Sequence, residues 1–137
     1  HGVHLGMKDA SLASACELMG DMAIIGRTVH TVEEARQVKD EGRCGYVGLG
    51  PFRSSKTKPG LRPVLEYPDL SEIKAILEPI PIFLIGGLGL ADFDLIDDLG
   101  IAGLAVRSAL SERDAFGANL EAFVERSRSF EQVEVSS

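Results

Sequence analysis

Short apolar runs recur along this chain and alternate with segments of helical periodicity. The runs begin near residues 2, 22, 46, 81 and 103, and a long polar loop follows the third of them. Apolar runs that alternate with helices are typical of a parallel sheet covered by helices. We therefore predict strands over 2–5, 22–26, 46–49, 81–85 and 103–106, and helices over about 12–19, 31–41, 70–77, 90–99 and 114–128, with a frayed tail over 131–137.

One helix start carries a recognisable capping signal. Thr31 is followed three residues later by Glu34, at the beginning of the second helical segment. In a capping box, the threonine side chain accepts from the glutamate N–H while the glutamate side chain reaches back to the N-cap N–H. The pattern predicts that the helix begins at this threonine.

The repeat fits a barrel better than an open dinucleotide-binding sheet, because no glycine fingerprint follows the first run. A closed (β/α)₈ barrel has eight strands and about 200 residues or more. This chain has 137 residues. The predicted fold class is α/β, of the TIM (β/α)₈ barrel family, with the chain covering about the last five βα units. Residues 1–130 would form the C-terminal part of one barrel domain, to be completed by a missing N-terminal half-barrel or by a homo-oligomer partner.

Charge and composition limit the classes of partner. The chain has 14 Lys and Arg against 21 Asp and Glu, a formal net charge of −7, which argues against nucleic-acid and membrane partners. Its apolar runs are too short to span a bilayer and no export signal opens it, so we expect a cytoplasmic protein. Cys16 and Cys44 lack metal-ligand spacing and are expected to be reduced, buried thiols.

Polar groups and glycines follow each predicted strand. In α/β folds of this kind the ligand binds beyond the carboxyl ends of the strands, which meet at one edge of the sheet. Glycines let backbone N–H groups approach an anion, and helix N-termini add partial positive charge. The sequence therefore predicts a phosphate-binding edge formed by Asp9, Thr28, His30, Ser55, Lys56, Thr57, Lys58, Gly86, Gly87, Arg107 and Ser108.

Several of these residues also have a purely structural interpretation. Gly86 and Gly87 could form only a tight turn, and Asp9 or Ser108 could be a helix N-cap. His30 could be a packed or capping histidine, and Lys56 could be a solvated side chain. These interpretations stay open at this point.

Several motifs resemble those of the thiamine phosphate synthase family, which includes the thiazole tautomerases. They occur in the family's order and cover almost the whole chain. The motifs are GVHLG (2–6) with Asp9, IIGRTVHT (24–31), YVGLGP (46–51) with SKTK (55–58), IGGL (85–88) and GLAVRSAL (103–110).

The resemblance implies a transferase reaction. Synthases of this family join hydroxymethylpyrimidine diphosphate to hydroxyethylthiazole phosphate and release pyrophosphate. Mg²⁺ and cationic side chains stabilise the departing diphosphate while the thiazole nitrogen attacks the pyrimidine methylene carbon. Such catalysis is mainly electrostatic and needs no protein nucleophile.

By motif position, the resemblance implies that Asp9 is a magnesium ligand. Thr28, in place of the usual serine, and Lys58 would belong to the pyrimidine diphosphate site, and both are expected to act in catalysis, together with His30. The thiazole phosphate site would consist of Ser55 (for the usual threonine), Lys56, Thr57, Gly86, Gly87, Arg107 and Ser108, with Gly87 and Arg107 acting through backbone N–H groups.

The chain also departs from the family pattern. Met7 stands where glutamine is usual. The family's Gln-x-Arg-x-Lys and Asn-Asp motifs, which hold the diphosphate and a second magnesium ligand, belong before His1, so these 137 residues alone are expected to be poor catalysts. Two alternatives stay open: an isomerase of the thiazole tautomerase type that uses His30 for proton transfer, and a non-catalytic phosphate-binding fragment.

Overall fold

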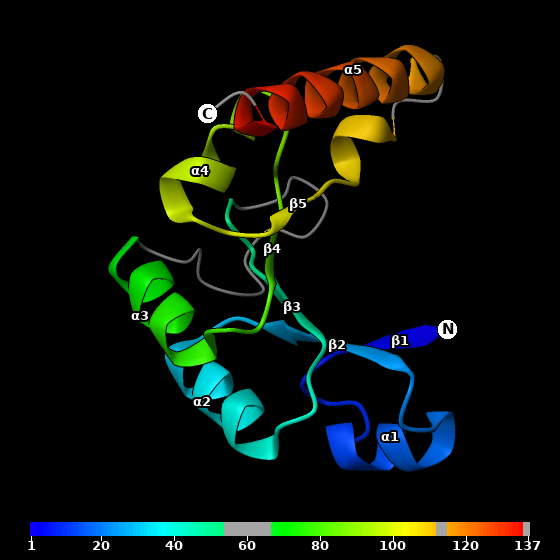
Figure 1. Cartoon of the computed structure of the whole chain (residues 1–137), viewed down its shortest axis with the longest axis vertical. Coiled ribbons are helices and arrows are strands. Elements are labelled where there is room, and N and C mark those ends of the chain that lie inside the picture. Colours follow the sequence, from blue (N-terminus) through cyan, green and yellow to red (C-terminus); the bar gives the residue numbers. More distant parts are fainter. Residues whose placement is uncertain (54–66, 112–114, 136–137) are drawn as a thin grey trace.

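Five parallel strands form one sheet in the order of the sequence, β1-β2-β3-β4-β5 (Figure 1). The computed structural model describes residues 1–53, 67–111 and 115–135. The predicted parallel sheet is confirmed, and within these residues β1 and β5 pair on one side only. The strands are β1 (Gly2–Leu5), β2 (Ile24–Val29), β3 (Tyr46–Leu49), β4 (Ile82–Ile85) and β5 (Gly103–Ala105).

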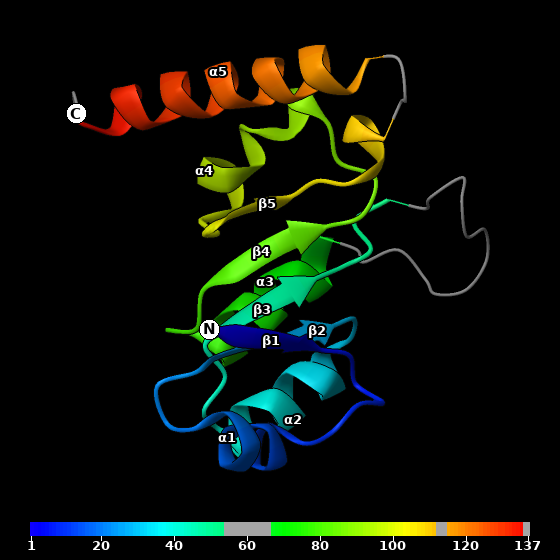
Figure 2. The ribbon, with the colours of Figure 1, turned by 90° about the vertical axis from the view of Figure 1, so that its right-hand side faces the viewer.

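Helices cover one face of this sheet and leave the other open. Figure 2 looks onto the open face, with α2 and α3 behind the strands and α1 below β1. No helix in the described ranges is long and apolar enough to cross a membrane. The helices are α1 (Leu12–Met19), α2 (Val32–Glu41), α3 (Tyr67–Leu77), α4 (Leu95–Leu99) and α5 (Phe116–Val135), with 3₁₀ turns η1 (Leu90–Asp92) and η2 (Ser108–Leu110).

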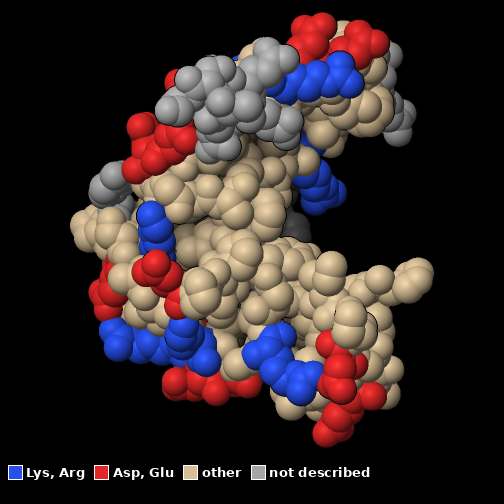
Figure 3. All heavy atoms as spheres, in the orientation of Figure 1, with Lys and Arg blue, Asp and Glu red and all other residues tan. Residues whose placement is uncertain are grey.

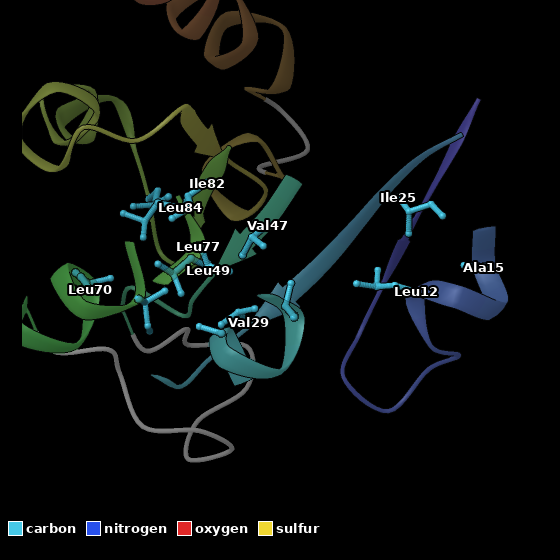
Figure 4. Close-up of a cluster of buried hydrophobic side chains, with 14 residues drawn as sticks. Leu12, Ala15, Ile25, Val29, Val47, Leu49, Leu70, Leu77, Ile82 and Leu84 are labelled. Atoms are coloured by element: carbon cyan, nitrogen blue, oxygen red, sulfur yellow. The ribbon is translucent and has the colours of Figure 1, made fainter. Parts of the chain in front are cut away.

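The core lies between the sheet and the helices (Figure 4). Leu12 and Ala15 of α1 pack near Ile25 of β2, while a larger group joins β3 and β4 to α2 and α3. Alternate strand residues point to this side, as the pleat requires. The fully buried side chains include Leu12, Val29, Val38, Val47, Ile73, Leu77 and Leu84.

The predicted end of β2 at residue 26 is wrong, because the strand continues to Val29. Arg27, in the part of the strand that the prediction left out, is charged but only 2% exposed. Its Nη1 donates to the Ala10 carbonyl at 2.6 Å, and its Nη2 lies 4.0 Å from Glu41 Oε1. Burial acts to raise the pKa of Glu41, but a hydrogen bond from Gln37 and another from a backbone N–H lower it overall.

Two helix predictions also need correction. The segment 90–99 is not one helix but η1 followed by α4, and the Asp92 carboxylate caps η1 by accepting from the Gly89 N–H at 2.7 Å. The final helix does not end at residue 128 with a frayed tail from 131, but continues to Val135. No proline or glycine interrupts 118–135, so nothing in the sequence stops the helix there.

Both cysteines are free thiols and partly buried. Cys44 Sγ donates to the Tyr46 carbonyl at 3.1 Å, and burial raises the pKa of this thiol. A raised pKa keeps the thiol protonated and unreactive at neutral pH, as expected for a structural cysteine.

The open face depends on a glycine that makes room for a ring. A Cβ on Gly26 would lie 2.2 Å from Cζ of Tyr46, which packs across β2 from β3. We expect Gly26→Ala to lower the free energy of unfolding by about 1–3 kcal/mol, as overpacking does. Gly89→Ala is the matched control, because nothing lies within 4 Å of its Cβ position. Urea unfolding measures both variants. Equal losses of unfolding free energy in Gly26→Ala and Gly89→Ala would contradict this explanation. So would a loss from Gly26→Ala that stays the same when Tyr46→Ala is also present.

Candidate anion-binding edge

The carboxyl ends of the strands lie together at the right-hand edge of the sheet in Figure 2. Predicted site residues from four of the five strand ends are described there: Asp9 after β1, Thr28 and His30 at the end of β2, Gly86 and Gly87 after β4, and Arg107 and Ser108 after β5. The other predicted site residues, Ser55, Lys56, Thr57 and Lys58, lie outside the described residues.

Thr28 is held by a cross-strand hydrogen-bond chain on the open face. Its Oγ1 lies 2.7 Å from Nε2 of His4, and Nδ1 of His4 lies 3.0 Å from the Tyr46 hydroxyl. The His4 and Tyr46 rings are also in contact, with centroids 5.4 Å apart. A neutral imidazole carries one ring proton, so in that form of His4 one hydroxyl donates to the ring and the other accepts from it. Sequence reasoning missed His4 and Tyr46, because they are brought to Thr28 by strand register.

Beside this chain of hydrogen bonds lies an apolar hollow of about 510 Å³. Figure 3 shows the open side of the molecule at the right, with mainly uncharged walls. Tyr46 meets Phe83 edge-to-face there, with ring centroids 5.8 Å apart. A flat, weakly polar ring is the kind of ligand that such walls suit. The hollow is lined by His4, Tyr46, Gly48, Phe83, Ile85 and Ala105.

His30 is tied to the start of α2. Its Nδ1 lies 2.8 Å from Glu34 Oε2, and its backbone N–H donates to the same oxygen at 2.7 Å. The Thr31 hydroxyl accepts from the Glu34 N–H as predicted, but the glutamate side chain reaches His30 instead of the N-cap residue. His30 therefore does have a capping contact, and its Nε2 has no hydrogen-bond partner among the described residues.

Asp9 is not the cap of α1, because Ser11 occupies that position and accepts from the Ser14 N–H. Asp9 instead accepts from the Gly6 N–H at 2.6 Å through Oδ2. This contact fixes an exposed carboxylate just beyond β1, and within the described ranges its Oδ1 has no partner. No group of three or more His, Cys, Asp or Glu able to hold a metal occurs in the described part of the chain. Asp9 would thus supply one ligand, which suits Mg²⁺ that takes its other ligands from water and phosphate oxygens.

The turn after β4 presents backbone N–H groups to this edge. Gly86 and Gly87 have φ of 97° and 67°, which only glycine adopts without strain. The N–H groups of Gly87 and Ser108 have no hydrogen-bond partner among the described residues. Neither residue opens an α-helix: Gly87 leads into η1, Ser108 begins η2, and both elements are single 3₁₀ turns. The N-cap position of η2 is Arg107, so Ser108 is not a helix cap.

An ion pair that the sequence analysis missed joins the loops after β3 and β4. Arg53 contacts Asp92 through both terminal nitrogens, at 2.9 and 2.7 Å. Asp92 is only 8% exposed, and the Arg53 guanidinium holds the pKa of its carboxyl below the ordinary value. The partners are 39 residues apart in sequence, so no local pattern indicates their contact.

Comparison with known proteins identifies the family of this chain. A family model described as thiamine monophosphate synthase matches residues 1–110. The chain belongs to this family. The thiamine-phosphate synthase of Flavobacterium psychrophilum is 39% identical over 117 residues, which are 82% of this chain and 56% of that protein. The family resemblance inferred from the motifs is thereby confirmed.

Solved structures give the same result for the fold. Thiamine phosphate pyrophosphorylase from Pyrococcus furiosus superposes with a TM-score of 0.74 and 26% identity, covering 93% of this chain and 59% of that one. A 3-hexulose-6-phosphate synthase, with a TM-score of 0.60 and 15% identity, shares the fold alone. The chain spans little more than half the length of the family members it matches.

The lowered pKa of Asp92 predicts a specific acid dependence of stability. The ordinary carboxyl pKa is 3.8 and the folded value is lower, so the ionised form is favoured by folding. Asp92→Asn should therefore lower the free energy of unfolding by its full amount above the unfolded-state pKa of the Asp92 carboxyl. The difference between wild type and variant should disappear as the pH falls through the folded-state pKa of that carboxyl. We expect roughly 1.5 kcal/mol at pH 7, the low end for hydrogen bonds to a charged group, because the Arg53 side chain is 49% exposed.

Urea unfolding of wild type and variant between pH 2 and pH 7 measures this difference. Asp94→Asn is the matched control, since Asp94 pairs with Arg126 but is 76% exposed. Asp94→Asn should change the free energy of unfolding by no more than about 0.5 kcal/mol, as is usual for surface ion pairs. If the difference in unfolding free energy between wild type and Asp92→Asn is the same at pH 2 as at pH 7, or grows on acidification, the lowered pKa of Asp92 is refuted.

Proposed function

We propose that this chain is the C-terminal part of a thiamine phosphate synthase and supplies the last five βα units of a (β/α)₈ barrel. The proposal is carried by the family match over residues 1–110, together with the presence of Asp9, Thr28, Gly87 and Ser108 at one edge of the sheet. The sequential parallel order of the strands supports the barrel, and the unpaired sides of β1 and β5 are where further strands would add.

The substrates are a pyrimidine diphosphate and a thiazole phosphate. In the reaction, the thiazole nitrogen bonds to the methylene carbon of the pyrimidine, and the bond from that carbon to the diphosphate oxygen breaks. The oxygen keeps the electron pair and leaves as pyrophosphate. The apolar hollow beside Tyr46 and Phe83 suits a flat ring held away from water, where charge stabilisation acts strongly.

Two anion sites follow from this assignment. Thr28 and Lys58 serve the diphosphate, and Thr28 is oriented for that role by His4. The thiazole phosphate is held by Ser55, Lys56, Thr57, Gly86, Gly87, Arg107 and Ser108. The N–H groups of Gly87 and Ser108, which have no hydrogen-bond partner among the described residues, are the main support for this second site.

Mg²⁺ is the proposed cofactor, with Asp9 as its ligand from this chain. When bound, Mg²⁺ would neutralise charge on the leaving diphosphate. The role of Asp9 is to hold its carboxylate beyond β1, which the Gly6 N–H helps to fix.

The N-terminal half of the barrel would complete the enzyme, by joining the edges of β1 and β5 and covering the open sheet face. The isomerase alternative is less favoured, because the relatives are named as thiamine-phosphate synthases. His30 is held to Glu34 in either case.

The function is tested by fusing the chain behind the upstream part of the F. psychrophilum relative, joined at the residue that matches His1. With both substrates and Mg²⁺, we expect thiamine phosphate and pyrophosphate in equal amounts. The 137-residue chain alone should form far less. A folded fusion that makes no thiamine phosphate, under conditions in which the complete relative does, would refute the proposal.

Lys58→Ala in the fusion should lower turnover by about 10²-fold or more, because one charge that faces the leaving diphosphate is removed. Thermal unfolding should change little, since a lysine in so polar a segment of the sequence has no expected role in the core. Lys39→Ala is a matched control: Lys39 lies on α2 and donates to the Glu78 carbonyl, away from the strand ends. Unchanged turnover of Lys58→Ala would remove this lysine from the mechanism.

Asp9→Asn should raise the Mg²⁺ concentration needed for half-maximal rate while leaving affinity for the thiazole phosphate nearly intact. A neutral amide is a poorer Mg²⁺ ligand than a carboxylate, but it can still accept from the Gly6 N–H. The rate is measured across a Mg²⁺ titration at saturating substrates. A normal Mg²⁺ requirement combined with a lowered melting temperature would show that Asp9 serves only the turn.

A further inference from the structure

We propose that Arg53 and Asp92 form a positioning pair that sets the turn after β4, so that the Gly87 N–H is presented to the thiazole phosphate. The inference rests on the proposed function and adds to it a pair of residues that do not themselves touch the substrate.

The pair holds the turn at several points. Arg53 donates to both Asp92 oxygens, and its Nη1 also donates to the Gly87 carbonyl at 3.2 Å. The Arg53 backbone N–H donates to the Gly86 carbonyl at 3.1 Å. Asp92 in turn accepts from the Gly89 N–H at 2.7 Å. The paired side chains therefore hold the Gly87 carbonyl and the Gly89 N–H, while the Arg53 backbone holds the Gly86 carbonyl.

These contacts decide which groups of the turn are left for an anion. The carbonyls of Gly86 and Gly87 would repel a phosphate, and Arg53 binds both of them. The Gly87 N–H keeps no partner among the described residues. The turn thus has these two acceptors satisfied and this donor available, an arrangement that favours an anion.

Close packing against Arg53 also explains why residue 87 is glycine. A Cβ at this position would lie 2.8 Å from Cβ of Arg53, and the φ of 67° is itself unfavourable for other residues. The predicted reason for the glycine, approach of the anion, is therefore not the only one. Gly87→Val would displace the positioning pair whether or not an anion binds, so it does not test the anion site cleanly.

Arg53 is poorly placed to be a phosphate ligand itself. Both of its terminal nitrogens bond to Asp92, and the carboxylate neutralises its charge. The guanidinium also stacks on the Phe52 ring, at 4.8 Å from the centroid. A residue so engaged orients the backbone and adds little net positive charge.

The test uses the 137-residue chain and calorimetric titration with hydroxyethylthiazole phosphate. Arg53→Lys and Asp92→Asn should each weaken binding roughly tenfold or more, the loss expected when a charge-assisted hydrogen bond to the anion is misaligned. The double variant should lose no more affinity than either single variant, because both substitutions break the same Arg53–Asp92 pair. Binding of the unphosphorylated thiazole alcohol should be unchanged in all variants, which a general loss of structure would not produce.

Arg36→Lys and Glu72→Gln are matched controls. They alter an exposed arginine–carboxylate pair between α2 and α3, away from the strand ends, and should leave affinity unchanged. Amide NMR spectra of each variant check that the chain is folded.

The outcomes separate the two proposals. Wild-type chain that does not bind the thiazole phosphate would refute the thiazole site of the proposed function, and the inference with it. Normal binding by the wild type with equal affinity in Arg53→Lys or Asp92→Asn would refute the inference alone. Tighter binding by Asp92→Asn would also overturn the inference, because Arg53, once released from Asp92, would then bind the phosphate directly.

Discussion

The common direction of the five strands is the constraint on which the candidate site depends. Because every strand runs the same way, Asp9, Thr28, Gly87 and Ser108 come to one edge although they span a hundred positions of the sequence. Polar groups at that edge need no burial in the core, which fills the opposite, helix-covered side of the sheet. Stability and binding are thus assigned to different parts of each βα unit, as barrels generally arrange them.

Two glycines show how backbone space is used to place larger side chains. Gly26 lets the Tyr46 ring lie across β2, where it meets His4 and so reaches the hydrogen-bond chain that ends at Thr28. Gly87 lets Arg53 approach the turn after β4 closely enough to hold its carbonyls. In both cases a side chain on the glycine would occupy the place of a residue that orients a candidate binding group. The glycines therefore contribute to the site by leaving room for Tyr46 and Arg53.

The sequence allowed β1, α1 and β3 to be predicted with the bounds that the structure has, because apolar runs and local caps define them. The end of β2 was missed because Arg27 is buried by tertiary contacts that no local pattern reveals. The candidate site was predicted residue by residue through the family motifs, yet the partners that orient it were not. His4 depends on strand register, and the Arg53–Asp92 pair depends on two loops that only the folded sheet brings together.

The central claim is that the loops after β4 and β5 hold one phosphate between them. The most direct measurement is a titration of the ¹⁵N-labelled chain with hydroxyethylthiazole phosphate, followed by amide NMR. The account predicts that the amide signals of Gly87 and Ser108 shift together, with one shared dissociation constant, and that the thiazole alcohol does not reproduce the shifts. Signals that stay in place at saturating ligand, or that move with two different dissociation constants, would contradict it.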